Sequence, residues 1–129
     1  MKIPYDPSSS KLLSFYDKIP GFINGTDTPR AYLERCIETI ETREHEVKAF
    51  VTLSLDRARE AADASTLRYK ENRILSPLDG MPLGMKDVFE TEDMPMQLGS
   101  PIFEGYETGW DAACVYFLRR GGAVMIGKT

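Results

Sequence analysis

The sequence predicts an α/β fold in which helices cover a sheet. Apolar side chains recur at helical spacing in residues 33–40, and an alanine-rich helical segment follows. Two short apolar runs, at residues 80–87 and 123–126, are separated by a further helical segment. Strand, crossover helix and strand form a βαβ unit, whose strands pair in parallel with a right-handed crossover. We therefore expect both runs to lie in one sheet packed against helices.

The first 27 residues are expected to form an N-terminal arm, because they are rich in Ser, Pro, Gly and Asp. One apolar patch in the arm suits a short docking helix. It contains Leu12, Leu13, Phe15 and Tyr16. Residues 28–129 are predicted to form the second unit, and they contain no internal repeat.

This second unit is predicted to begin with a helix capped by Thr28, with Pro29 at its first position. Its apolar stripe is expected to pack on the core. The stripe consists of Leu33, Cys36, Ile37 and Ile40. Residues 41–48 are charged and predict a connection, followed by a short strand or extended segment at 49–53.

The next helix is predicted to be capped by Asp56 and to end near Asn72. Residues 77–80 predict a turn, and residues 93–109 a long loop of the kind that often carries function. A third helix is expected from residue 111 to 120, before the buried strand at 123–126.

Lys86 is the most informative residue, because it ends a short apolar, glycine-bearing segment. On a strand it would share a face with the compact residues Pro82 and Gly84, which leaves room beside its amine. We expect Lys86 to be buried, and burial favours the neutral amine, which is a base. On spacing alone, a solvated lysine at a strand end fits equally well.

Several blocks in order distinguish these alternatives. They are Lys86-Asp87, Leu98-Gly99-Ser100-Pro101, Asp111-Ala112, Leu118-Arg119-Arg120-Gly121-Gly122-Ala123 and Gly127-Lys128-Thr129. This set resembles the amidase signature family from about Thr28 onward. The resemblance implies the N-terminal part of an α/β/α fold, with a mixed sheet covered by helices.

The resemblance also implies a serine hydrolase of carboxylic amides that uses a nucleophilic serine, a second serine with a cis peptide bond, and a lysine. The family's lysine block matches residues 80–87, so Lys86 is the expected catalytic lysine. Both serines belong to a segment after the match to residues 127–129. We therefore expect this chain to supply only the lysine and to be inactive alone. No metal or organic cofactor is implied.

The substrate is left open by departures from the family pattern. Met96-Gln97 stands where small hydroxyl residues are frequent, and Asp79 stands where histidine is frequent. Gly99 and Ser100 are candidate residues of the substrate pocket wall. The family includes hydrolases of small amides and one of the subunits of glutamine-dependent tRNA amidotransferases. We favour a free-standing hydrolase acting on a small-molecule amide, and a protein like that amidotransferase subunit is the alternative.

A different class of function is a noncatalytic or split-chain component. A sheet ending near residue 126 would expose an unpaired edge and an apolar face. These features predict a partner, which is the remainder of the domain, a complementary chain, or a second copy in a homodimer.

Residues 122–129 also match the phosphate-binding pattern G-x-x-x-x-G-K-[ST]. A phosphate loop follows a strand and opens a helix, whereas here a helix comes first and the intervening residues form an apolar β run. We therefore interpret the match as accidental and Lys128 as a strand end.

Composition supports a globular protein, with 42% hydrophobic and 28% charged residues and a net charge of −4, which disfavours nucleic-acid binding. No targeting or membrane-spanning segment is visible, so a cytoplasmic location is expected. Cys36 and Cys114 suit small core residues in helices, and His45, the only histidine, suits a solvated surface. None of the three is part of a metal-binding pattern.

Overall fold

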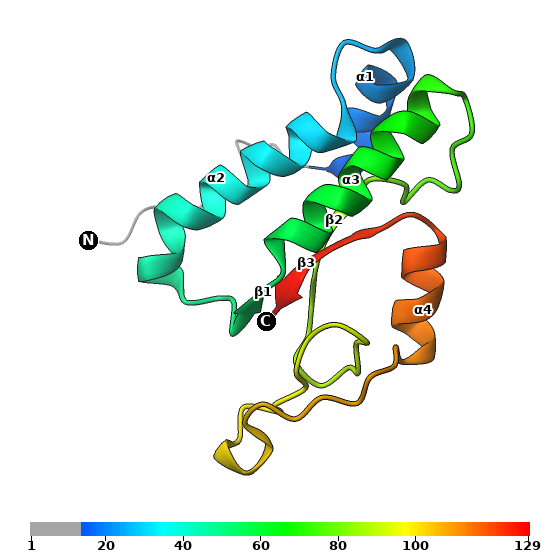
Figure 1. The fold of residues 1–129 in the computed structure, drawn as a ribbon. Helices are drawn as coiled ribbons and strands as arrows, with labels where there is room; N and C mark the ends of the chain where they lie inside the picture. The colour runs from blue at the N-terminus through cyan, green and yellow to red at the C-terminus, as the bar shows by residue number, and fades with distance from the viewer. Residues whose placement is uncertain (1–13) are drawn as a thin grey trace, which may run out of the picture.

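The computed structural model describes residues 14–129 and shows a small mixed sheet between helices (Figure 1). The elements in chain order are η1 (Phe15–Lys18), α1 (Ile19–Asn24), α2 (Pro29–Val47), β1 (Thr52–Leu53), α3 (Leu55–Lys70), β2 (Pro82–Met85), η2 (Pro101–Phe103), α4 (Ala113–Arg120) and β3 (Val124–Lys128). The predicted α/β class is confirmed.

The strand order is β1-β3-β2, with β3 in the centre. β2 and β3 are parallel and are joined through α4, as the βαβ prediction required, while β1 pairs with β3 antiparallel. The β2–β3 register shifts between Leu83 and Gly84, after which Met85 lies opposite Lys128. The carboxyl ends of the two parallel strands therefore lie side by side, and Lys86 follows directly.

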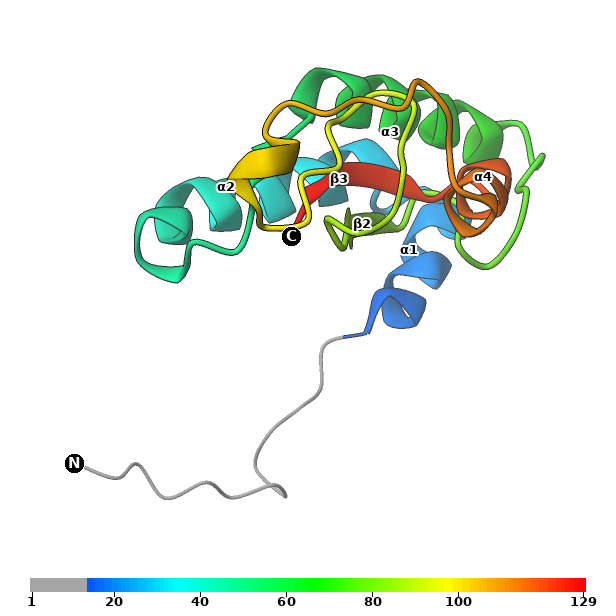
Figure 2. The same cartoon turned by 90° about the horizontal axis from the view of Figure 1, so that it is seen from below.

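Both faces of β3 are covered, and the alternation of its side chains explains how. Val124 and Ile126 point to one face and Met125 to the other. On the first face α2 and α3 supply the core residues Leu33, Ile37, Ala58 and Ala62. On the second face the core residues are Met85, Met94, Val115 and Ala123, from β2, the following loop, α4 and the residue before β3. Figure 2 shows α4 at one end of β3.

Helix α2 begins as predicted, with the Thr28 hydroxyl accepting a hydrogen bond from the Ala31 N–H at 3.1 Å. The prediction of a connection at residues 41–48 is wrong, because the helix continues to Val47. Its charged side chains lie mostly on a solvated face and do not interrupt the backbone ladder. Lys48, with a left-handed φ of 50°, ends the helix.

Two predicted boundaries of α3 are corrected. Ser54 occupies the cap position, whereas Asp56 lies in the first turn, where an acidic side chain interacts favourably with the helix N-terminus. The helix ends at Lys70, and Asn72 lies beyond it with a left-handed φ of 53°. The extended segment before α3 forms β1 as expected.

Part of the predicted arm is packed on the helices. Phe22 of α1 is buried, and its ring lies 5.4 Å from that of Tyr69 in α3 and 5.9 Å from that of Phe15. Phe15 therefore docks as expected, whereas Tyr16 is exposed. Leu12 and Leu13 lie outside the described residues. A domain boundary at residue 27 stays a prediction.

The helix predicted at residues 111–120 starts two residues later. Ala112 is extended, and the Asp111 carboxylate instead accepts the Glu92 N–H at 2.9 Å and pairs with Arg119 at 3.0 Å. Within residues 14–129, no helix is long and apolar enough to cross a membrane.

Neither cysteine is a fully buried core residue. Cys36 is half-buried, while Cys114 is exposed because it faces away from the sheet on the short helix α4, so its predicted burial is wrong.

Candidate active site

Lys86 lies at the carboxyl end of β2 and is exposed in this chain, so its predicted burial is wrong. The strand ends at Met85, whose side chain turns into the core, whereas the Lys86 side chain that follows lies exposed. The Lys86 ammonium donates a hydrogen bond to the Thr129 carbonyl oxygen at 2.9 Å. The amine is thus held at the ends of both parallel strands.

Asp87 is buried and faces inward. Its carboxylate accepts the Gln97 N–H, with nitrogen to oxygen distances of 3.1 and 3.2 Å. Its own N–H donates to the Thr129 carbonyl at 2.9 Å, and its carbonyl accepts the Leu98 N–H at 3.1 Å. Asp87 therefore joins residues 86–89, called the lysine turn below, both to β3 and to the following loop.

Among the described residues the buried lysine is Lys128, the last residue of β3, with no exposed surface. Its ammonium donates to the Phe89 carbonyl at 2.7 Å and lies 3.5 Å from the Asp87 carboxylate. Burial lowers the pKa of Lys128, and the negative charge of Asp87 opposes part of that shift. Sequence reasoning placed Lys128 at a strand end but missed its burial, because its counterion Asp87 is distant in the sequence.

The phosphate-loop pattern is occupied by a strand. β3 spans Val124–Lys128, so these residues form an extended ladder and not a loop that curls around an anion. The ammonium of Lys128 points at protein oxygens. This geometry supports the interpretation that the sequence match is accidental.

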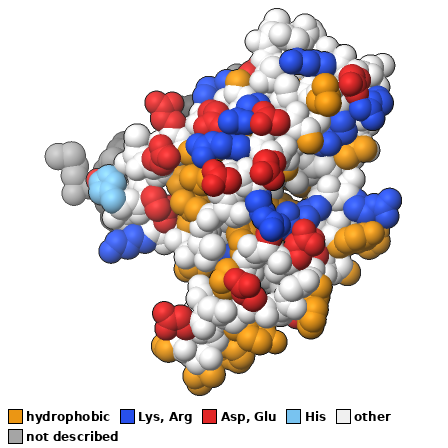
Figure 3. All heavy atoms as spheres, viewed as in Figure 1, with side chains coloured by type: hydrophobic (Ala, Val, Ile, Leu, Met, Phe, Trp, Pro, Cys, Tyr) orange, Lys and Arg blue, Asp and Glu red, His pale blue; other side chains and the backbone are white. Residues whose placement is uncertain are grey.

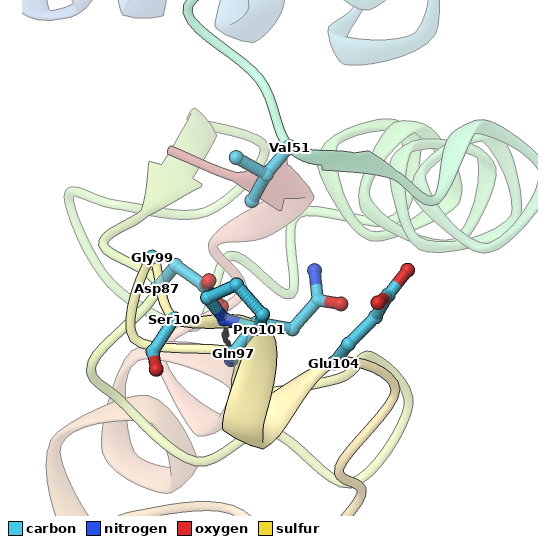
Figure 4. A pocket seen from close by; sticks show the side chains of 7 residues that line it. All are labelled: Val51, Asp87, Gln97, Gly99, Ser100, Pro101 and Glu104. Atoms are coloured by element: carbon cyan, nitrogen blue, oxygen red, sulfur yellow. Dashed lines mark hydrogen bonds between the residues drawn. The ribbon is translucent and has the colours of Figure 1, made fainter.

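A pocket of about 310 Å³ lies beside the lysine turn, at the carboxyl ends of β2 and β3. Its lining includes both candidate loop residues, Gly99 and Ser100, with Val51, Asp87, Gln97, Pro101 and Glu104 (Figure 4). Ligands of open α/β sheets bind outside the carboxyl ends of the strands, which is this position. Lys86 does not line the pocket, but the next residue of the lysine turn, Asp87, does.

The two departures from the family pattern have different locations. Gln97 lines the pocket, and its side-chain carbonyl accepts the Gly105 N–H at 3.0 Å. Asp79 precedes β2, at the strand end opposite Lys86, and is completely buried. It accepts hydrogen bonds from the Arg68 guanidinium at 2.6 and 2.9 Å. Of the two positions, only Gln97 lines this pocket.

Within residues 14–129, no three His, Cys, Asp or Glu side chains are grouped so that they could hold a metal ion. His45 is exposed, as predicted, and lies 3.6 Å from Glu46.

Comparisons with known proteins agree with this architecture. The amidase family model matches residues 31–129. The chain is 37% identical over 109 residues to a subunit of the glutamyl-tRNA(Gln) amidotransferase of Thermobifida fusca, covering 84% of this chain and 21% of that protein. It thus spans about a fifth of the length of the curated relatives it matches.

Solved structures show the same fold. The native peptide amidase of Stenotrophomonas maltophilia superposes with a TM-score of 0.84 at 25% identity, covering 95% of this chain and 25% of that one. A chain of a vestigial protein complex, described as revealing the origins of an s-triazine catabolic enzyme, also gives a TM-score of 0.84. Its identity is 30%, covering 90% of this chain and 26% of the other. With the family model matching most of its length, this chain belongs to the amidase signature family.

Proposed function

We propose that the protein hydrolyses the C–N bond of a carboxylic amide, with Lys86 as the base of a Ser-cisSer-Lys triad. The observation that carries the proposal is the position of the Lys86 ammonium, 2.9 Å from the Thr129 carbonyl at the ends of the parallel strands. The next residue, Asp87, lines a pocket. In the family that the sequence resembles, both serines follow the block matched by residues 127–129. A segment continuing from Thr129 would start beside the amine.

In this mechanism the Lys86 amine accepts a proton from the bridging serine, which in turn deprotonates the nucleophilic serine as it attacks the amide carbonyl. The tetrahedral intermediate expels the amine or ammonia, which takes up the relayed proton, and an acyl-enzyme remains. Water then releases the acid. Since the chain contributes only the lysine, we expect residues 1–129 alone to be inactive.

A second candidate is a protein that works as a subunit of a tRNA-dependent amidotransferase, and the observation that favours it is the name shared by the curated relatives. In both candidates water accepts the acyl group. They differ in the fate of the ammonia, which a hydrolase releases and an amidotransferase transfers to an aminoacyl-tRNA. Glutamine hydrolysis that depends on a partner protein and a charged tRNA would favour the second candidate. Turnover of small amides by the protein alone would favour the first.

The split-chain alternative is supported by the exposed apolar surface of this chain. Large side chains lie open on the loop after β2 and on α4, and orange patches mark one part of this surface at the bottom of Figure 3. The most exposed of them are Ile102, Trp110 and Phe117. Such a surface fits a covering partner, which is the rest of the domain, a complementary chain or a second copy.

A cytoplasmic location stays a prediction.

The test uses the polypeptide encoded by the complete reading frame, a panel of aliphatic, aryl and peptide amides with glutamine, and the variant Lys86→Ala. We expect kcat to fall by at least about a hundredfold, because a general base contributes roughly 10²–10⁴. Lys70→Ala is the control, since Lys70 is exposed at the end of α3. A Lys86→Ala enzyme that folds and turns over normally would refute the assignment.

A further inference from the structure

Several hydrogen bonds hold the turn that carries Lys86, and Lys128 supplies one of them. The Thr129 carbonyl accepts both the Lys86 ammonium and the Asp87 N–H, each at 2.9 Å. The Asp87 carboxylate fixes the Gln97 N–H. From inside, the Lys128 ammonium reaches the Phe89 carbonyl at 2.7 Å and the Asp87 carboxylate at 3.5 Å.

These contacts surround Lys86 in the sequence. Asp87 is the next residue, and the Phe89 N–H donates to the Lys86 carbonyl at 3.0 Å, which closes the turn. On the strand side, Lys128 lies opposite Met85, the residue before Lys86. Lys128 thus contacts the turn on the C-terminal side of Lys86 while its backbone pairs with the N-terminal side.

Burying a lysine at this position is costly for stability. An ammonium removed from water needs a compensating charge and hydrogen bonds, and an apolar side chain of similar volume would often be as stable or more so. Among the described residues, Lys128 is the one cation that is completely buried. Its buried charge is compensated by groups of the lysine turn, with Asp93 as a further negative charge nearby.

We propose that Lys128 is a positioning residue of the active site: by holding Asp87 and Phe89 it sets the direction in which Lys86 projects. This inference rests on the proposed function, because it assigns Lys128 an effect on the reaction of Lys86. Lys128 itself does not touch the substrate. Its loss would leave the Lys86 amine present but free to leave the reactive geometry, and a displacement of about 1 Å can lower turnover about a hundredfold.

The experiment compares Lys128→Met, Asp87→Asn and the double variant Lys128→Met/Asp87→Asn in the polypeptide of the complete reading frame, with Lys70→Met as the matched control. Lys128→Met should lower kcat about 10- to 100-fold and leave KM within about twofold, since it changes the orientation of a base and not the pocket. It should also lower thermal stability, because Asp87 loses its counterion.

The double variant separates positioning from folding. Removing both charges eliminates the uncompensated carboxylate, so we expect thermal stability to recover while kcat stays low. Recovery of both quantities would show that Lys128 serves the fold alone and would overturn the inference. An unchanged kcat in Lys128→Met would also overturn it.

Lys86→Ala, measured alongside, distinguishes a failure of the positioning role of Lys128 from a failure of the proposed function. If Lys86→Ala is inactive and the double variant is fully active, the positioning role fails and the proposed function stands. If Lys86→Ala retains normal turnover, the proposed function fails, and the role of Lys128 fails with it.

Discussion

Replacing Arg68 by methionine should destabilise the protein through the buried carboxylate of Asp79. This carboxylate is fully buried, while 20% of the Arg68 side chain is exposed. Arg68→Met removes two hydrogen bonds and leaves the Leu75 N–H, at 3.0 Å, as a remaining donor. Breaking a buried pair from one side costs about 3–5 kcal/mol, and the partial exposure of Arg68 favours the lower end, about 3 kcal/mol.

The assay is urea unfolding of the parent and Arg68→Met at pH 7. Arg73→Met is the control, because Arg73 is 65% exposed and pairs with the half-exposed Glu71, so its loss should cost less than about 0.5 kcal/mol. A loss of under about 1 kcal/mol in Arg68→Met would refute the reasoning that this buried pair holds the chain before β2.

The same pair predicts a dependence on pH. Burial alone would raise the pKa of Asp79, but hydrogen bonds from Arg68 and Leu75 outweigh it, and the net pKa lies below the usual value. A carboxyl whose pKa is lowered on folding contributes stability that is present above its unfolded pKa of about 3.9 and is lost as the pH falls through the folded pKa. The parent's advantage over Arg68→Met should therefore be largest near pH 7 and shrink on acidification. It shrinks first because burial without Arg68 raises the pKa of Asp79 in the variant, so that this carboxyl is neutralised early, and then because the pH falls through the lowered folded pKa of the parent. An advantage that grows on acidification would contradict this sign.

Two further predictions concern the loop after β2 and the centre of the sheet. Arg119→Met should lower the free energy of unfolding in urea by about 2–3 kcal/mol, because the nearly buried carboxylates of Asp93 and Asp111 both lose their closest guanidinium. Arg120→Met is the control and should cost far less, because Arg120 is exposed. Equal losses of stability in the two variants would argue against the ion-pair network. Gly127→Ala should lower the urea midpoint by the equivalent of about 1–3 kcal/mol, because a Cβ there collides with a backbone carbonyl of β1, and an unchanged midpoint would show that the two strands do not approach so closely.

The sequence predicted the arrangement of elements well where the signal was local. The capped start of α2, its apolar stripe and the βαβ unit were all present in the pattern, because helix caps and side-chain periodicity depend on near neighbours. The charged residues 41–48 were misassigned as a connection, since high polarity is equally compatible with a solvated helix.

The burial of the two lysines was the main error. Strand periodicity states which face a side chain occupies but not which layer covers that face. Lys86 follows the last residue of β2 and lies open, whereas Lys128 is covered by the turn and loop that follow β2. The pairing of Lys128 with Asp87 joins residues 41 positions apart, so no local pattern could reveal it.

The sequence by itself determined the fold class, the parallel βαβ unit and the family resemblance, since each depends on the order and spacing of residues along the chain. The catalytic role of Lys86 is a prediction that follows from this resemblance. Only the tertiary structure decided which lysine is buried, how Asp87 links the turn to β3, and that the loop at Gly99 and Ser100 lines a pocket at the carboxyl ends of the strands. The reason is that desolvation and counterion contacts depend on distances in space between segments far apart in the sequence.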